Sequence, residues 1–258
     1  GCLDYLAENG INNYIQYTIN DYVAEKLERG VPALQERIDT FKRLVDKLGF
    51  GKVIWRFDPM ILTDQIGCDD LLAKIEKIGD QLMGYIEKLV FSYADIRTYR
   101  KVQANLKKNA VNYREFEQED MLYIAENLAR LNERWGLILA TCGERVDLGP
   151  YGIVHNKCID DDLMIKYFSE DQKLMDFLGV EIIRGDLFNP DNTIIKRKNN
   201  KDKRQRQFCG CIVSKDIGEY NTCPHLCEYC YANVSKETAV HNWQQHKLNI
   251  NAETITGR

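Results

Sequence analysis

Three cysteines near the C-terminal end, Cys223, Cys227 and Cys230, follow a Cys-x3-Cys-x2-Cys spacing. Thiolates this close in sequence can converge on one small metal assembly, and soft sulfur ligands select iron-sulfur clusters, zinc or copper(I). If the assembly is a [4Fe-4S] cluster, three cysteines leave one iron without a protein ligand. That open iron can bind a small molecule, so the spacing predicts a cluster that takes part in chemistry.

Four further cysteines are candidates for a second metal site: Cys142, Cys158, Cys209 and Cys211. A single cysteine is usually a small buried hydrophobic residue. The two that flank Gly210 are harder to explain by packing, and four thiolates complete the ligand set of a second cluster or of a structural zinc ion. We therefore expect these four side chains to lie close together in the folded chain.

Apolar periodicity alternates along the chain between strands and helices. We predict strands over 14–20, 52–58, 89–93, 137–141 and, with less regularity, 211–214, and helices over 2–9, 34–48, 69–83, 119–135 and 160–168, with a polar loop over 97–113. Such alternation implies parallel pairing with right-handed crossovers. The 258 residues therefore predict a single α/β domain, a partial parallel TIM-like β/α barrel.

Strand parity selects side chains for the site, because residues two apart face the same way and barrel sites lie at strand carboxyl ends. Arg56 and Asp58 share one face, whereas Trp55 and Phe57 point to the opposite, helix-covered side. The other candidates at the same mouth are Gln16, Thr18, Ser92 and, more weakly, Glu144. Arg56 and Asp58 are equally compatible with a buried structural ion pair.

The overall charge of -4 argues against a broad nucleic-acid-binding surface. Residues 195–206 nevertheless contain seven Lys or Arg against one Asp. We interpret the stretch 195–208 as a basic, solvated loop. The alternative is a phosphate-binding strip, as expected if the substrate were a nucleic acid.

No apolar stretch approaches the length of roughly 20 residues that a membrane span needs, and the first residues do not resemble a secretory signal. Five of the nine cysteines lie between residues 209 and 230. This crowding favours metal ligation in a reducing compartment over a disulfide framework. We therefore expect a cytoplasmic protein with no membrane association.

The segment Cys-Glu-Tyr-Cys-Tyr at 227–231, with Tyr229 directly before the last cysteine, resembles the cluster loop of radical S-adenosylmethionine enzymes, especially the spore photoproduct lyase branch. Residues 203–211, 214–218 and 220–223, together with Trp55-Arg56-Phe57-Asp58-Pro59, resemble the bacterial family called domain of unknown function 1848. Its members are uncharacterised. This second resemblance extends over nearly the whole chain, from about residue 14 to 233.

The resemblance implies a radical S-adenosylmethionine-type iron-sulfur enzyme, with S-adenosylmethionine and a [4Fe-4S] cluster as cofactors and an unknown substrate. Arg56 would hold the carboxylate of S-adenosylmethionine and Asp58 its ribose hydroxyls, with Gln16, Thr18, Ser92 and Tyr229 beside them. A reductant protein such as flavodoxin or ferredoxin would supply the electron.

The resemblance also implies a circularly permuted barrel, because the cluster segment 209–233 follows the strands instead of preceding them. Family members carry a further segment at their front, so we expect the N-terminal strands of the barrel to be missing from this chain. The alternative function is a zinc- or iron-sulfur-binding structural or interaction protein without radical chemistry.

Overall fold

The computed structural model describes residues 1–183, 185 and 193–256, and its centre is a parallel sheet. The sheet contains β1 (Ile15–Thr18), β2 (Val53–Met60), β4 (Lys88–Tyr93), β6 (Ile138–Thr141) and β7 (Ile153–His155), in that order. All four neighbouring pairs are parallel. Because the order in the sheet is the order in the chain, each connection moves one step in the same direction, as in β/α units.

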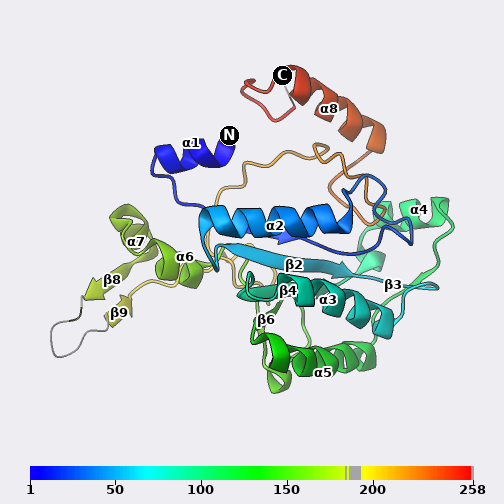
Figure 1. The fold of residues 1–258 in the computed structure, drawn as a ribbon, viewed down its shortest axis with the longest axis horizontal. Helices are drawn as coiled ribbons and strands as arrows, with labels where there is room; N and C mark the ends of the chain where they lie inside the picture. The colour runs from blue at the N-terminus through cyan, green and yellow to red at the C-terminus, as the bar shows by residue number, and fades with distance from the viewer. Residues whose placement is uncertain (184, 186–192, 257–258) are drawn as a thin grey trace.

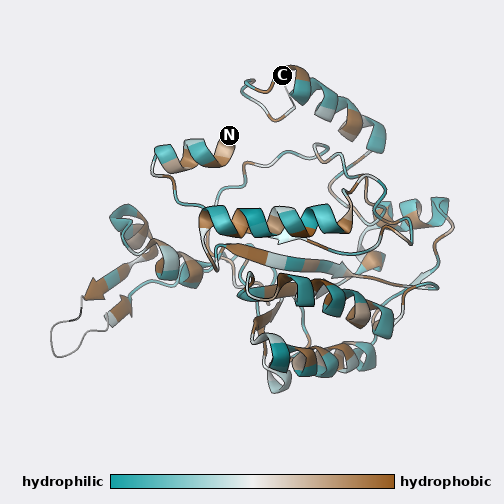
Figure 2. Ribbon diagram, in the orientation of Figure 1, coloured by the Kyte–Doolittle hydropathy of each residue, from teal (hydrophilic) through white to brown (hydrophobic). Residues whose placement is uncertain are grey.

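Three helices cover one face of this sheet: α2 (Leu34–Leu48), α3 (Cys68–Leu82) and α5 (Gln118–Trp135) (Figure 1). Trp55 and Phe57 on β2 are fully buried in the core beneath these helices, as their strand parity predicts. Full burial of each such side chain contributes about 2–3 kcal/mol relative to exposure. Figure 2 shows hydrophilic residues along the outer side of α2, so only its inner stripe joins the core.

A shorter helix, α6 (Asp161–Phe168), packs on the opposite face. Asp160 caps it as predicted, because its carboxylate accepts hydrogen bonds from the backbone N–H groups of residues 162 and 163. Leu163 and Phe168 pack against Ile54 of β2, together with Val90 and Ala140 of the neighbouring strands. This small core covers the beginning of the strands, and their carboxyl ends stay free for polar side chains.

The remaining elements are short. They are α1 (Cys2–Glu8), β3 (Leu62–Thr63), η1 (Ile96–Thr98), α4 (Arg100–Lys108), β5 (Tyr113–Arg114), η2 (Gly149–Tyr151), α7 (Gln172–Leu178), β8 (Val180–Ile183), β9 (Thr193–Lys196) and α8 (Lys236–Leu248). β8 and β9 form an antiparallel pair that extends from the sheet beside α6 and α7 (Figure 1). Within the described residues, no helix combines the length and apolar character that crossing a bilayer requires.

Two local predictions are wrong. The expected polar loop over 97–113 contains helix α4, whose buried stripe consists of only Val102 and Leu106 and is obscured by the surrounding charges. The expected strand over 211–214 is a single bridge between Lys201 and Ile212, and the fifth strand of the sheet is β7. Three residues are too few for a periodic signal, which is why β7 escapes detection.

The basic stretch 195–208 begins inside a strand, because residues 195 and 196 belong to β9. Lys196 forms ion pairs with Asp161 and Asp162, and Arg197 pairs with Glu181. Its first two cations are therefore neutralised by carboxylates of the same chain, which weakens the expectation of a continuous phosphate-binding strip.

Candidate metal centre and cofactor site

Four of the predicted site residues meet across β1, β2 and β4, with Asp58 and Ser92 toward the carboxyl ends of β2 and β4 and Gln16 near the start of β1. Arg56 donates from Nε to Asp58 Oδ2 at 3.1 Å and from Nη1 to Gln16 Oε1. Ser92 Oγ donates to Asp58 Oδ1 on the other side. The Arg56 side chain is only 13% exposed, and although burial opposes its charge, Asp58 holds the pKa of Arg56 above its usual value. The result is a rigid, charged group at a strand end.

Thr18 is placed differently. It lies on the edge strand β1 in register with Arg56, but its side chain is exposed. No side-chain hydrogen bond of Thr18 occurs within the part of the chain that the structure describes. Among the predicted cofactor-site residues of β1, only Gln16 joins the polar cluster.

The backbone of the segment that carries the three cysteines is tied to the loop that follows β1. Glu228 N donates to Leu27 O at 2.9 Å, and Gly30 N donates to His225 O at 2.9 Å. A Cβ atom at Gly30 would lie 2.7 Å from His225 O, so only glycine permits this approach. Because the loop after β1 leaves the carboxyl end of the sheet, the cysteine segment lies at that end, beside α4 (Figure 1).

Tyr229 connects the cysteine segment to the strands. Its hydroxyl donates to Glu28 and accepts from Asn20 Nδ2 at 3.2 Å. The same Asn20 amide exchanges two hydrogen bonds with the backbone of Asp58, with Asp58 N to Asn20 Oδ1 at 2.9 Å. Burial raises the pKa of Tyr229, so its hydroxyl keeps its proton and remains a donor. One amide thus joins the segment to the polar cluster around Arg56.

The three thiols of Cys223, Cys227 and Cys230 lie near one another. Burial raises the pKa of Cys227 to about 12, and Glu28 and the other two thiols add to the effect. The three sulfurs do not all lie within 4.8 Å of one another, as the ligands of a single ion would.

A buried cation lies beneath the same segment. Arg37 is 4% exposed and donates from Nη1 to Asn20 O at 2.8 Å. Its Nε and Nη2 atoms are buried without a hydrogen-bond partner among the described residues. Burial and the charge of Arg37 together lower the pKa of His225 in the cysteine segment. Glu28 Oε2 lies 3.6 Å from Arg37 Nη1, so this buried guanidinium already has a carboxylate beside it. The donors that fit the group implied by the spacing are the three free thiols themselves.

Glu228 is a buried, paired residue of the cysteine segment that sequence reasoning missed. Its carboxylate is fully buried and forms ion pairs with Arg29 Nε at 3.1 Å and Lys236 Nζ at 2.6 Å. Asn109 Nδ2, at the residue directly after α4, donates to it at 2.9 Å. Asn109 and Arg29 lie more than a hundred residues away from Glu228 in sequence, so no local motif indicates the contact. The carboxylate fastens the cysteine segment to three parts of the chain.

The four remaining candidate cysteines also come together. The sulfurs of Cys142 and Cys158 lie 3.4 Å apart, and Cys158 N donates to Cys211 Sγ at 3.1 Å. The thiol of Cys158, together with burial and the thiol of Cys209, raises the pKa of Cys211. Contacts with Cys142 and Cys211, reinforced by Arg56, lower the pKa of Cys158. Arg56 Nη1 lies 3.2 Å from Cys158 Sγ, so this group borders the polar cluster.

A cavity of about 880 Å³ opens beyond the ends of β4 and β6. Glu144 lies in its wall and accepts a hydrogen bond from Tyr93 N at 3.0 Å. Burial raises the pKa of Glu144 from 4.5 to about 6. The charged residues that line the cavity are Asp95, Arg97, Glu115, Glu144, Arg145, Asp147 and Arg206.

The raised pKa of Glu144 makes stability depend on pH. The folded chain binds the Glu144 proton more tightly than the unfolded chain, so this contribution is complete below about pH 4.5 and is lost as the pH rises through 6. Glu144→Gln removes the buried charge, and we expect it to stabilise the protein by up to about 2 kcal/mol at pH 7 and by almost nothing at pH 4.5. Urea unfolding of both proteins across this range measures the difference. Equal gains at both pH values would contradict this account.

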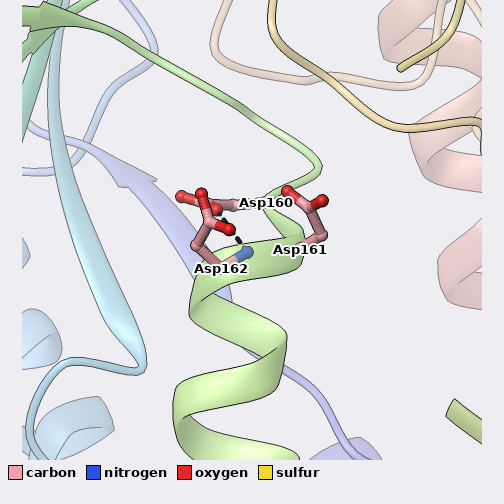
Figure 3. Close-up of side chains that lie close together, drawn as sticks. All are labelled: Asp160, Asp161 and Asp162. Carbon is pink, nitrogen blue, oxygen red and sulfur yellow. Dashed lines mark hydrogen bonds between the residues drawn. The ribbon is translucent and has the colours of Figure 1, made fainter. Parts of the chain in front are cut away.

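Asp160, Asp161 and Asp162 are the only group of potential metal ligands within 4.8 Å of one another in the described residues (Figure 3). Their charges already have partners on the chain. Asp160 caps α6 and pairs with Lys88, and Asp161 pairs with Lys157. Asp162 pairs with Lys157 as well. The group is therefore explained as the charged start of a helix.

Comparison with known proteins identifies a family but no characterised relative. A family model described as "Domain of unknown function (DUF1848)" matches residues 1–232. Searches of curated proteins and of solved structures find no match to the chain. The matched region includes the strands, the polar cluster, both groups of cysteines and the Glu228 anchor.

Proposed function

We propose that this chain, which belongs to the family of domain of unknown function 1848, is a radical S-adenosylmethionine-type iron-sulfur enzyme. The observation that carries the proposal is the link from Tyr229 through Asn20 to Asp58. It holds the Cys-x3-Cys-x2-Cys segment at the carboxyl end of a parallel sheet, where the sites of β/α barrels are built.

When bound, the cluster supplies the electron that cleaves S-adenosylmethionine and yields a 5′-deoxyadenosyl radical for hydrogen abstraction from the substrate. Cys223, Cys227 and Cys230 would hold the cluster. Arg56 would bind the carboxylate of S-adenosylmethionine through the one Nη2 N–H that its contacts with Asp58, Gln16 and Cys158 leave free, in a direction that those contacts fix.

The other polar residues orient the cofactor and the substrate. Asp58 and Ser92 face the ribose, and Gln16 fixes the plane of the Arg56 guanidinium. The cavity beside Glu144 is the proposed place for the substrate, because Glu144 accepts a hydrogen bond from the backbone N–H of Tyr93, the residue directly after Ser92.

We propose that the sheet is part of a circularly permuted TIM-like barrel. Its five parallel strands follow chain order, and the cysteine segment comes after them. A closed barrel has no physical first strand, so moving the chain ends leaves the arrangement at the mouth unchanged. The two open edges of the present sheet are β1 and β7, and a closed barrel would have to connect them.

An external reductant is required, and a flavodoxin or ferredoxin is the proposed partner. A nucleic-acid substrate is a weaker possibility. It rests on the cations of the basic stretch after Arg197, since Lys196 and Arg197 themselves are paired with acidic residues.

The alternative function is a zinc- or iron-sulfur-binding structural protein. One observation favours it: the Glu228 carboxylate attaches the cysteine segment to the rest of the chain through two ion pairs and a hydrogen bond. In that case the metal would stabilise the C-terminal part of the chain and no cofactor would be cleaved.

Anaerobic reconstitution with iron and sulfide separates the two functions. We expect a brown protein whose broad visible absorbance bleaches on reduction and which releases 5′-deoxyadenosine from S-adenosylmethionine. Cys223→Ala/Cys227→Ala/Cys230→Ala should reduce the release to background, whereas Cys2→Ala, at an exposed cysteine elsewhere, should leave it unchanged. If zinc alone binds and no cofactor is cleaved, the structural alternative holds.

A further inference from the structure

We propose that Cys142, Cys158, Cys209 and Cys211 form a second, separate centre for a soft metal, either a zinc ion or a small iron-sulfur cluster. The proposal does not rest on the function of the first three cysteines. It concerns a different set of ligands on the face of the sheet beside Arg56.

Three distant segments deliver these thiols to one place. Cys142 directly follows β6, Cys158 follows β7, and the pair Cys209 and Cys211 comes from the connection after β9. If these side chains only filled space in the core, any small apolar residue could occupy each of the four positions. Convergence of four thiols from three separate segments is instead what a thiolate-bound metal requires.

One sulfur–sulfur distance is of the size that metal ligation needs. Four sulfurs around one zinc ion lie about 3.8 Å apart, as follows from bonds of about 2.3 Å in a tetrahedron. The sulfurs of Cys142 and Cys158 are 3.4 Å apart, and Cys211 Sγ lies 3.1 Å from the backbone N of Cys158. A disulfide bond between Cys142 and Cys158 would need a separation of about 2.05 Å, which the two sulfurs do not have.

Hydrogen-bond donors already point at the sulfurs. Cys211 Sγ accepts from the backbone N–H groups of Cys158 at 3.1 Å and Ile159 at 3.4 Å. Cys158 Sγ is approached by Arg56 Nη1 at 3.2 Å and by Asn156 Nδ2 at 3.5 Å. Such donors offset the negative charge that thiolates retain when they bind a metal, so the surroundings are built for ligation.

The four thiols are more open than a finished ligand shell, because no three of them lie within 4.8 Å of one another. Metal binding would draw them together and release their protons. Moving the sulfurs closer together would disrupt no helix or strand, since Cys209 and Cys211 lie outside these elements.

The test uses the full chain with Cys223→Ala/Cys227→Ala/Cys230→Ala as background, so that only the second centre can bind metal. Purified without oxygen, this protein should carry about one zinc per chain, or iron together with sulfide. Adding Cys158→Ser should lower the metal content at least about tenfold. Adding Cys68→Ser, at a half-buried cysteine elsewhere, should not change it.

A second measurement guards against a variant that does not fold. In the background protein, maleimide should leave Cys142, Cys158, Cys209 and Cys211 unmodified until a chelator is added, while Cys2 reacts at once. A folded background protein without metal, or a Cys142–Cys158 disulfide found by mass spectrometry, would overturn the proposal. Neither outcome bears on the first three cysteines, which are absent from this protein.

Discussion

Glu228→Ala is expected to detach the cysteine segment from the sheet. The substitution removes ion pairs to Arg29 and Lys236 and leaves the Asn109 amide without its acceptor. Hydrogen bonds to a charged group contribute about 1.5–3 kcal/mol each, but Arg29 is 52% and Lys236 33% exposed, so solvent screening lowers the sum over these contacts. We therefore expect a local loss of about 2–3 kcal/mol. Hydrogen exchange of residues 219–233 should accelerate about 30-fold or more, while exchange in β2 and β4 stays slow.

Lys236→Ala is the matched control, because it removes one partner whose side chain is 33% exposed and leaves the other contacts of Glu228 in place. Its effect should be below about 1 kcal/mol. Equal exchange rates in Glu228→Ala and the unmodified protein would show that the backbone contacts to Leu27 and Gly30 hold the segment without the carboxylate.

Asp58→Ala should be among the most destabilising substitutions in the sheet. It leaves Arg56, which is only 13% exposed, without its counter-charge, and removing one partner of such a pair costs about 3–5 kcal/mol. Arg56→Met/Asp58→Ala should recover about 2 kcal/mol of this loss, because no isolated charge remains. Urea unfolding of both single variants and the double variant gives the coupling energy.

The exposed pair of Arg130 and Glu126 on α5 supplies the comparison, since both side chains are at least half exposed. Glu126→Ala should cost less than about 1 kcal/mol. If the losses in the free energy of unfolding caused by the Arg56 and Asp58 substitutions simply add up in the double variant, the two residues are not energetically coupled. The double variant also separates structure from function. A purely structural pair would leave cofactor cleavage intact once stability is restored, whereas the proposed binding role requires cleavage to fail.

Much of the sheet could be predicted because its strands and helices are long enough to show a period. The alternation in β2 correctly places Trp55 and Phe57 under the helices and Arg56 and Asp58 on the other face. The helices α2, α3 and α5 each run for at least four turns, and Gly136 ends α5 in the left-handed conformation. Local chemistry suffices for such elements.

What the sequence does not reveal depends on contacts between distant segments. Asn20 connects Tyr229 to Asp58, and nothing in its neighbourhood marks it as a bridge. The same is true of the buried Arg37 beneath the cysteine segment. Strand parity alone selects Thr18 as a candidate. Its side chain nevertheless remains exposed, because β1 is at the edge of the sheet. Parity determines the face of a strand and says nothing about what covers it.

The most direct test of the radical-enzyme account is the electron paramagnetic resonance spectrum of the reconstituted, reduced protein with and without S-adenosylmethionine. The account predicts a cluster signal that changes when S-adenosylmethionine is added, because the cofactor binds the iron that Cys223, Cys227 and Cys230 leave open. The change should vanish in Cys227→Ala and persist in Cys2→Ala. A cluster signal that is indifferent to S-adenosylmethionine in the unmodified protein would contradict the account.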